Sequence, residues 1–123
     1  MKTITQRYKF DFAHHLPGYN GLCQRAHGHT GILEVTLREH KCLRRFWEKY
    51  PGMIIDWNIM KGLIAERVLI HIDHNDLNTL MDIPTAENLL DWVIDRLKDD
   101  FGEALEVVRI YESDKAWVTW KRE

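Results

Sequence analysis

The 123-residue sequence has few cysteines, few prolines and no excess of charge of one sign: it contains two cysteines and three prolines, and its net charge is −2. Two cysteines, Cys23 and Cys42, cannot form the disulfide framework typical of a small secreted domain, so we expect both thiols to be free. A general nucleic-acid-binding protein normally has a strongly basic surface, which a slightly negative chain does not supply. We therefore expect no nucleic-acid partner.

Long apolar runs are also missing. No stretch approaches the roughly 20 apolar residues that span a membrane, and the first residues, MKTITQRYKF, lack the apolar segment of a signal peptide. These absences predict no membrane association and a cytoplasmic location. A hydrophobic content of 45% is typical of a soluble globular chain, and the length is that of a single domain over residues 1–123.

Alternating apolar and polar residues predict strands towards both ends of the chain. Apolar side chains fall on even positions in residues 3–13 and on odd positions in residues 30–38. Two further strands are expected in residues 104–112 and 115–120. The segment LPGYNGLCQRA, residues 16–26, is expected to be a loop because it is rich in turn-forming residues.

Helical patterns occupy the middle of the chain. Asp56 is a candidate N-cap for a first helix. The expected apolar face of this helix consists of Ile59, Leu63 and Ile70. Thr85 is a candidate N-cap for a second helix that ends near Gly102. The expected inward side chains of the second helix are Leu89, Leu90, Val93 and Leu97.

The charged and aromatic segment EHKCLRRFWEKYPG, residues 39–52, is compatible with one more short helix, closed by its final Pro-Gly pair. The main elements follow in the order strand, strand, helix, helix, strand, strand. This order favours an α+β fold in which helices cover one face of an antiparallel sheet.

Histidines extend the apolar faces of the first two strands. His27 and His29 continue the odd-numbered apolar row of residues 30–38, and His14 continues the even-numbered row of residues 3–13. Three imidazoles and one open position are typical of a catalytic zinc site, whereas structural zinc sites have four protein ligands. A turn whose histidines form local hydrogen bonds is the alternative interpretation. The shared register with His14 favours zinc.

Cys23 lies four residues before His27, in a loop beside this predicted cation site. A thiol near a cation can serve as a proton acceptor. As a fourth zinc ligand it would instead close the site, and as a buried thiol it would only pack. Cys42 has no such neighbours, and we interpret it as a packing residue.

Two carboxylates, those of Asp73 and Glu112, are further candidate site groups. Asp73 precedes His74, and an adjacent carboxylate can orient an imidazole for acid–base catalysis, although helix ends are often polar without such a role. Glu112 lies on the apolar face of a predicted strand, where an unpaired carboxylate is costly. Either a basic side chain pairs with it, or it accepts two parallel hydrogen bonds from a ligand, such as the amino edge of a pterin.

Six segments, in order, resemble the 6-pyruvoyl-tetrahydropterin synthase family: FAHHLPGY, CQRAHGH, MIIDWNIMK, IDHNDLN, PTAENLLDWV and VRIYES. The resemblance covers nearly the whole chain. The CxxxHGH spacing is most similar to the bacterial queuosine-pathway branch, 6-carboxytetrahydropterin synthase. The fold implied is the tunnelling fold (T-fold), with a four-stranded antiparallel sheet and two helices on one face. Three copies would join their sheets into a barrel, and two barrels would stack as a hexamer.

The resemblance also implies roles for single residues. One zinc ion per chain would be bound by His14, His27 and His29. Catalysis would use Cys23 as proton acceptor together with the Asp73–His74 pair. Glu112 would anchor the pterin ring and also belong to the catalytic residues. The remaining residues expected to bind substrate are Thr85 and Arg25.

The activity implied is that of a lyase. It would convert 7,8-dihydroneopterin triphosphate into 6-carboxy-5,6,7,8-tetrahydropterin, with release of triphosphate and acetaldehyde, for queuosine biosynthesis. One alternative is the sibling reaction, which eliminates triphosphate and ends at 6-pyruvoyl-tetrahydropterin. A second alternative is a zinc- or pterin-binding homologue without catalytic activity.

Overall fold

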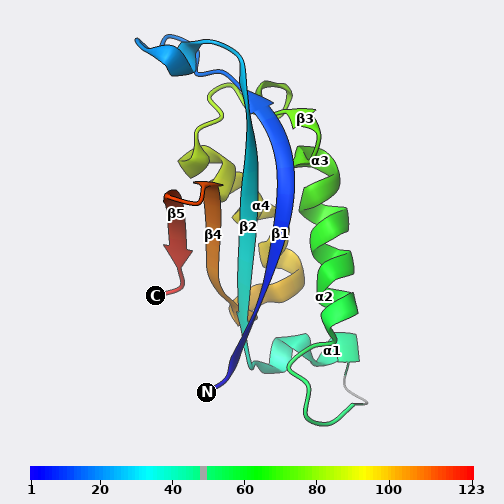
Figure 1. Ribbon diagram of the computed structural model, residues 1–123. Helices are drawn as coiled ribbons and strands as arrows, with labels where there is room; N and C mark the ends of the chain where they lie inside the picture. Colours follow the sequence, from blue (N-terminus) through cyan, green and yellow to red (C-terminus); the bar gives the residue numbers. More distant parts are fainter. Residues whose placement is uncertain (48–49) are drawn as a thin grey trace.

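A five-stranded sheet in the order β3-β1-β2-β4-β5 forms the frame of the protein in the computed structural model, which describes residues 1–47 and 50–123 (Figure 1). The antiparallel strands are β1 (Thr3–His14), β2 (His27–Arg38), β4 (Leu105–Ser113) and β5 (Ala116–Lys121). These four strands confirm the predicted antiparallel sheet. The fifth, β3 (Asn75–Asp76), is a two-residue strand that pairs parallel to the end of β1 and was not predicted.

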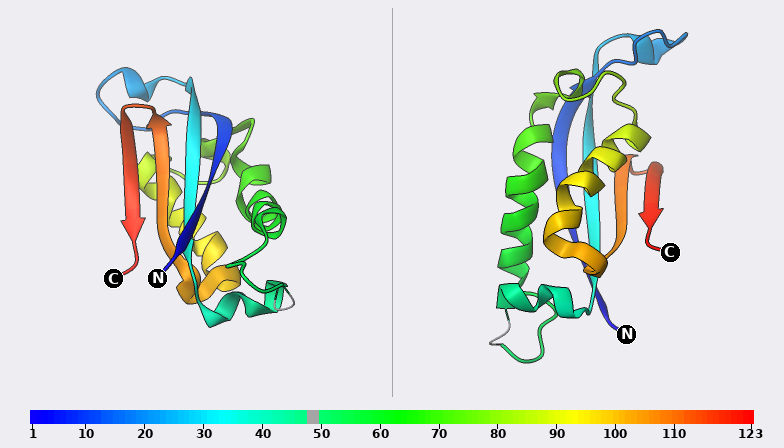
Figure 2. Two further views of the ribbon diagram at one scale, coloured as in Figure 1. Left: turned by 60° about the horizontal axis from the view of Figure 1, so that its bottom comes forward. Right: turned by 180° about the vertical axis from the view of Figure 1, so that it is seen from behind.

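The two long strands have one buried face each, and these faces coincide. On β1 the buried side chains are at even positions, including Phe10 and Phe12, and on β2 the buried apolar side chains are at odd positions, including Leu33 and Val35. The helices lie against this face of the sheet, as the view from behind shows (Figure 2). No helix of residues 1–47 and 50–123 covers the opposite face, which includes the odd positions of β1 (Figure 2).

The first helical region contains three consecutive segments: α2 (Trp57–Ile64), the π-helical η3 (Ala65–Leu69) and α3 (Ile70–Ile72). Asp56 caps α2 as predicted, because its carboxylate accepts a hydrogen bond from the Asn58 N–H. The fully buried side chains of the three segments are Met60, Ile64, Val68 and Ile72.

The predicted apolar face of this region was wrong at Ile70, whose side chain is 67% exposed. Ile59 and Leu63 are partly buried and do pack against the core. An α-helix has 3.6 residues per turn, so a row of side chains spaced by four rotates away from the sheet. The wider turn of η3 reduces this drift, which keeps Val68 and Ile72 on the buried face.

The second helix, α4 (Ala86–Phe101), agrees with its prediction. The Thr85 hydroxyl accepts a hydrogen bond from the Asn88 N–H at 3.1 Å, which caps the first turn. The helix ends at Gly102, which has a φ of 52° that few other residues adopt. Its buried side chains are Leu89, Leu90, Val93, Leu97 and Phe101.

Short helical turns complete the chain: η1 (Leu22–Gln24), η2 (Lys41–Leu43), α1 (Arg44–Trp47), η4 (Leu77–Thr79) and η5 (Gly102–Ala104). Together η2 and α1 confirm a short helix in residues 39–47, while residues 48–49 of the predicted segment lie outside the described part of the chain. No helix in the described part is both long enough and apolar enough to cross a membrane.

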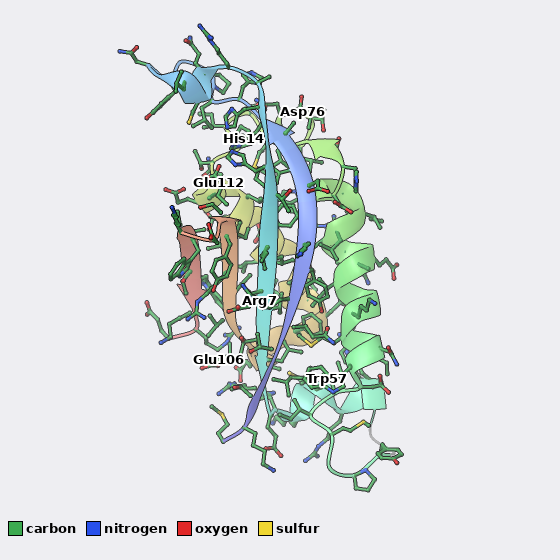
Figure 3. The ribbon with its side chains drawn as sticks, in the orientation of Figure 1. Arg7, His14, Trp57, Asp76, Glu106 and Glu112 are labelled. Carbon is green, nitrogen blue, oxygen red and sulfur yellow. The ribbon has the colours of Figure 1, made fainter. Side chains whose placement is uncertain are left out.

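Most of the predicted site residues gather at one end of the sheet. His14 and Glu112 lie together there, and Glu106 and Trp57 lie towards the opposite end (Figure 3). The segment of residues 15–26 extends beyond the end of the sheet at which β1 finishes and β2 begins, away from the rest of the molecule (Figure 1).

We predict that Gly31→Ala destabilises the fold, because a Cβ at this position would lie 3.0 Å from the rings of Phe10 and Phe12 and 3.0 Å from the Tyr111 carbonyl. Overpacking of this kind costs about 1–3 kcal/mol. Gly62→Ala in α2 is the matched control, since its Cβ would meet no atom within 4 Å. That variant is expected to gain about 0.5–1 kcal/mol from helix propensity. Urea unfolding measures both, and a Gly31→Ala protein as stable as wild type would contradict the close packing.

Candidate metal and catalytic site

Three imidazoles converge where β1 ends and β2 begins. The antiparallel register places His14 directly opposite His27 and Phe12 opposite His29. Ring centroids are 4.5 Å apart for His14 and His27, 4.9 Å for His14 and His29, and 4.8 Å for His27 and His29. One ring nitrogen from each residue lies within 4.8 Å of the others. The structure therefore brings together all three predicted metal ligands.

Backbone carbonyls determine which nitrogen of two of these rings bears the proton. His14 Nδ1 lies 2.8 Å from the Pro84 carbonyl, and His27 Nδ1 lies 2.7 Å from the Arg25 carbonyl. A carbonyl only accepts hydrogen bonds, so Nδ1 is the donor and Nε2 of the neutral ring keeps its lone pair. Metal-binding histidines commonly donate their other N–H in this way.

The Nε2 atoms of His14 and His29 are buried, and neither has a hydrogen-bond partner among the described residues. Buried polar atoms in native proteins are nearly always satisfied, so two such atoms at one point need an explanation. A divalent metal ion would satisfy both, and three neutral imidazoles are a suitable donor set for it. The three histidines thus fit a metal ion and form a candidate metal site.

Glu112 lies over this cluster. Its Oε1 is 3.2 Å from His14 Nε2 and 3.3 Å from His29 Nε2, and its side chain is 34% exposed. Close contact with the Glu112 carboxylate raises the pKa of His14 above its ordinary value of 6.5, although burial of the ring opposes this shift. Contact with His14 in turn lowers the pKa of Glu112 below 4.5, against the effect of burial. Burial lowers the pKa of His29.

Thr85 lies near Glu112, since both line a small gap together with His14 and Pro84. In the described structure the Thr85 hydroxyl caps α4, as noted above. The two residues expected to anchor a pterin ring are therefore neighbours, although Thr85 immediately precedes α4 and Glu112 lies near the end of β4.

Asp73 and His74 form the predicted pair. His74 Nδ1 lies 3.0 Å from Asp73 Oδ1. His74 lies in a turn between α3 and β3; it has a φ of 55° and is the one non-glycine residue with a positive φ in residues 1–47 and 50–123. A conformation of this kind in a non-glycine residue costs about 1–3 kcal/mol and occurs preferentially at functional sites.

An open pocket of about 520 Å³ connects the two groups. Its lining includes His29 from the metal cluster and His74 from the acid–base pair, together with Asp11 and Thr30. The pocket thus borders one residue of the metal cluster and one residue of the acid–base pair.

Cys23 and Arg25 lie on the segment that extends beyond the sheet. Cys23 is a half-buried free thiol in η1, and its sulfur is not among the atoms grouped with the three histidines. The structure therefore does not place it as a fourth metal ligand. Arg25 is exposed and touches the cluster through its carbonyl, which holds His27. The role of its side chain in substrate binding stays a prediction.

Sequence analysis missed the groups that hold the site residues in place. The carbonyls of Pro84 and Arg25 are backbone atoms, which no residue pattern marks. Asp11 belongs to the exposed face of an alternating strand, where an acidic side chain is ordinary. The cross-strand register of β1 with β2 would have shown that it lies opposite Thr30.

Comparison with known proteins identifies the family of this chain. The family model of 6-pyruvoyl tetrahydropterin synthase matches residues 3–123. Several curated relatives, 27–34% identical, bear the name 6-carboxy-5,6,7,8-tetrahydropterin synthase. The relative from Synechocystis sp. is 29% identical over 92% of this chain and 88% of its own. The one from Archaeoglobus fulgidus, described as putative, is 30% identical over 92% of this chain and 90% of its own.

Among solved structures, the 6-pyruvoyl tetrahydropterin synthase of Caenorhabditis elegans superposes with a TM-score of 0.79, over 99% of this chain and 96% of that one, at 23% sequence identity. This likeness shows a shared T-fold subunit. The protein is thus an α+β T-fold chain with a three-histidine site at the end of its sheet. It belongs to the 6-pyruvoyl tetrahydropterin synthase family, which confirms the resemblance seen in the sequence.

We predict a bell-shaped pH dependence for the stabilising effect of Glu112 in the metal-free protein. A raised pKa means that His14 contributes stability below pH 6.5 and loses it as the pH rises through the folded-state value. A lowered pKa means that Glu112 contributes stability above pH 4.5 and loses it as the pH falls through the folded-state value. Glu112→Gln should therefore lower the free energy of unfolding most between pH 4.5 and 6.5.

Urea unfolding of chelator-treated protein across this pH range measures the effect. Glu106→Gln is the matched control, because Glu106 Oε2 lies 3.6 Å from Arg38 Nε, and an arginine stays charged throughout. Its effect should not decline on the alkaline side. An effect of Glu112→Gln that grew above pH 6.5 would contradict the assigned contact.

Proposed function

We propose that this protein is a zinc-dependent lyase that converts 7,8-dihydroneopterin triphosphate and one water molecule into 6-carboxy-5,6,7,8-tetrahydropterin, triphosphate and acetaldehyde, as a step of queuosine biosynthesis. The observation that supports this most is the convergence of three imidazoles, two of whose buried Nε2 atoms have no hydrogen-bond partner among the described residues and only the Glu112 carboxylate within ion-pair range. Family membership and the names of the curated relatives support the substrate class.

His14, His27 and His29 would hold the zinc ion. A bound zinc ion acidifies oxygen ligands and polarises the bonds next to them. The Pro84 and Arg25 carbonyls would keep two of the rings in the tautomer that zinc binding requires.

The proton transfers are assigned to other residues. Cys23 would accept a proton from the substrate side chain, and His74 would deliver one, with its ring oriented by Asp73. Glu112 and Thr85 would hold the pterin ring, since a carboxylate can accept two parallel hydrogen bonds from the amino edge of the pterin. Arg25 is expected to contact the substrate.

The active unit is expected to contain several chains, as a trimer or as a hexamer of two trimers. The outer strand β5 leaves a row of backbone groups unpaired at the sheet edge, and its Trp117 is exposed. Closing sheets around an axis would pair such edges. The pocket lined by His29 and His74 does not include Cys23 among its described lining. We therefore propose that Cys23 acts in a site completed by a neighbouring chain.

We predict steady turnover of 7,8-dihydroneopterin triphosphate, with one acetaldehyde formed for each triphosphate released. Product analysis by chromatography and an aldehyde assay checks both. Triphosphate without acetaldehyde would instead indicate 6-pyruvoyl-tetrahydropterin as the product. A protein that binds zinc and pterin without turnover would show that the chain is not an enzyme of this kind.

We predict that Cys23→Ala keeps one zinc ion per chain and loses turnover by about 10²–10⁴-fold, the usual cost of removing a general base. Metal analysis and rate are measured on the same preparation. Cys42→Ser is the matched control, since the Cys42 thiol donates to the Phe101 carbonyl and a hydroxyl can do the same. His29→Ala is expected to lose zinc and activity together. Loss of zinc in Cys23→Ala would overturn the assignment of Cys23 as a base.

We predict that mixing two inactive variants, Cys23→Ala and His74→Ala, under conditions of subunit exchange restores part of the activity. A shared site would then combine an intact thiol from one chain with an intact imidazole from another. The control is the same mixture kept under conditions in which the subunits do not exchange. A shared site would be excluded if light scattering showed that the fully active wild-type protein is a monomer and if mixing the variants restored no activity.

A further inference from the structure

The orientation of His74 is not determined by packing. Its side chain is 77% exposed, so surrounding atoms do not restrict the ring as they restrict a core side chain. An exposed imidazole samples several rotamers unless polar contacts hold it. A residue that must deliver a proton in one direction therefore needs such contacts, and Asp73 supplies one of them at Nδ1.

Asp11 contacts both members of the Asp73–His74 pair. Its backbone N–H donates to Asp73 Oδ1 at 2.9 Å, and its carbonyl accepts from the His74 N–H at 2.6 Å. Its carboxylate oxygen Oδ2 lies 3.8 Å from His74 Nε2. The imidazole thus lies between two carboxylates, one near each ring nitrogen.

Thr30 holds the Asp11 carboxylate in this position. The Thr30 hydroxyl donates to Asp11 Oδ1 at 2.6 Å, and the two residues are direct partners in the β1–β2 register. With Oδ1 engaged by Thr30, Oδ2 is the oxygen that faces His74. A side chain held from a strand is more rigid than one on a loop, and the anchor here consists of two strands.

We propose that Asp11 is a positioning residue: held by Thr30, it orients the His74 ring so that Nε2 faces the pocket that also contains His29. At 3.8 Å the contact is within ion-pair range but longer than a hydrogen bond. Nε2 therefore remains free to exchange a proton with a bound molecule. This inference rests on the proposed function, in which His74 is the proton donor.

Strand β1 connects the metal cluster with the Asp73–His74 pair. Strand β1 presents His14 to the metal cluster from its buried face and Asp11 to His74 from its open face, three residues apart. The same strand therefore sets the distance between the metal cluster and the acid–base pair. A second cation held by Asp11, Asp73 and His74 is the competing explanation, because their ligand atoms also lie within 4.8 Å of one another.

The test compares Asp11→Asn, Thr30→Val and Thr30→Ser with an Asp91→Asn control. Asp91 is an exposed carboxylate on α4, against the other face of the sheet. We expect Asp11→Asn to lower kcat about 10-fold with KM changed less than about two-fold, as loss of an orienting partner does. Thr30→Val should cause a smaller loss of the same kind, and Thr30→Ser should recover most of it. The double variant Asp11→Asn/Thr30→Val should lose no more than Asp11→Asn alone, because both act through one contact.

A second readout does not depend on activity. NMR relaxation of ¹³C-labelled histidine, with the His74 signal assigned by its absence in His74→Gln, reports the order parameter of the ring. We expect a value near the rigid limit of about 0.85 in wild type and below about 0.6 in Asp11→Asn. Asp91→Asn should leave kcat and the His74 order parameter unchanged.

The outcomes separate the two proposals. A wild-type protein without turnover would defeat the proposed function, whereas the NMR result would still decide whether Asp11 orients His74. An Asp11→Asn protein with wild-type kcat and an ordered ring would overturn the positioning role. Two metal equivalents per chain in wild type and one in Asp11→Asn would overturn it as well, and would assign the cluster to a second cation.

Discussion

The antiparallel pairing of β1 with β2 is the interaction on which the rest of the site depends. A shift of one residue in this register would turn every side chain of one strand to the other face of the sheet. His14 would then leave the cluster, and Asp11 would lose Thr30 as its partner. The register is strongly specified because one face of each strand packs against the helical layer, where Phe10, Leu33 and Val35 are buried.

This pairing divides the chemistry between the two faces of one strand pair. The buried side supplies imidazoles whose nitrogens are shielded from water, a suitable setting for a metal ion. The open side supplies Asp11, one of the two carboxylates beside His74, where a proton can be exchanged with a molecule in the pocket. Glu112, which lies over the cluster from β4, adds a carboxylate between the metal histidines and the region of Thr85.

The ends of two helices position residues of the site. The π-helical turn η3 keeps Val68 and Ile72 against the sheet, so the chain leaves α3 close to the end of β1. There it forms the short parallel pairing of β3 with β1, and His74 adopts its positive φ immediately before it. The Pro84 carbonyl, which holds His14, lies just ahead of the Thr85 cap of α4. Both contacts come from helix ends whose positions the core determines.

Local periodicity and capping depend on neighbouring residues, so the strand pattern, the α4 face, the caps at Asp56 and Thr85, and the three histidines as candidate ligands could be predicted from the sequence. Spacing, adjacency and strand register also singled out Cys23, Asp73, His74 and Glu112, and the family resemblance implied their roles. The exposure of Ile70, the pairing of β3 with β1, and the contact of Asp11 (held by Thr30) with His74 follow only from the tertiary structure. Each of these depends on contacts between segments distant in the chain, and a π-helical turn or a cross-strand register leaves no mark in the local pattern.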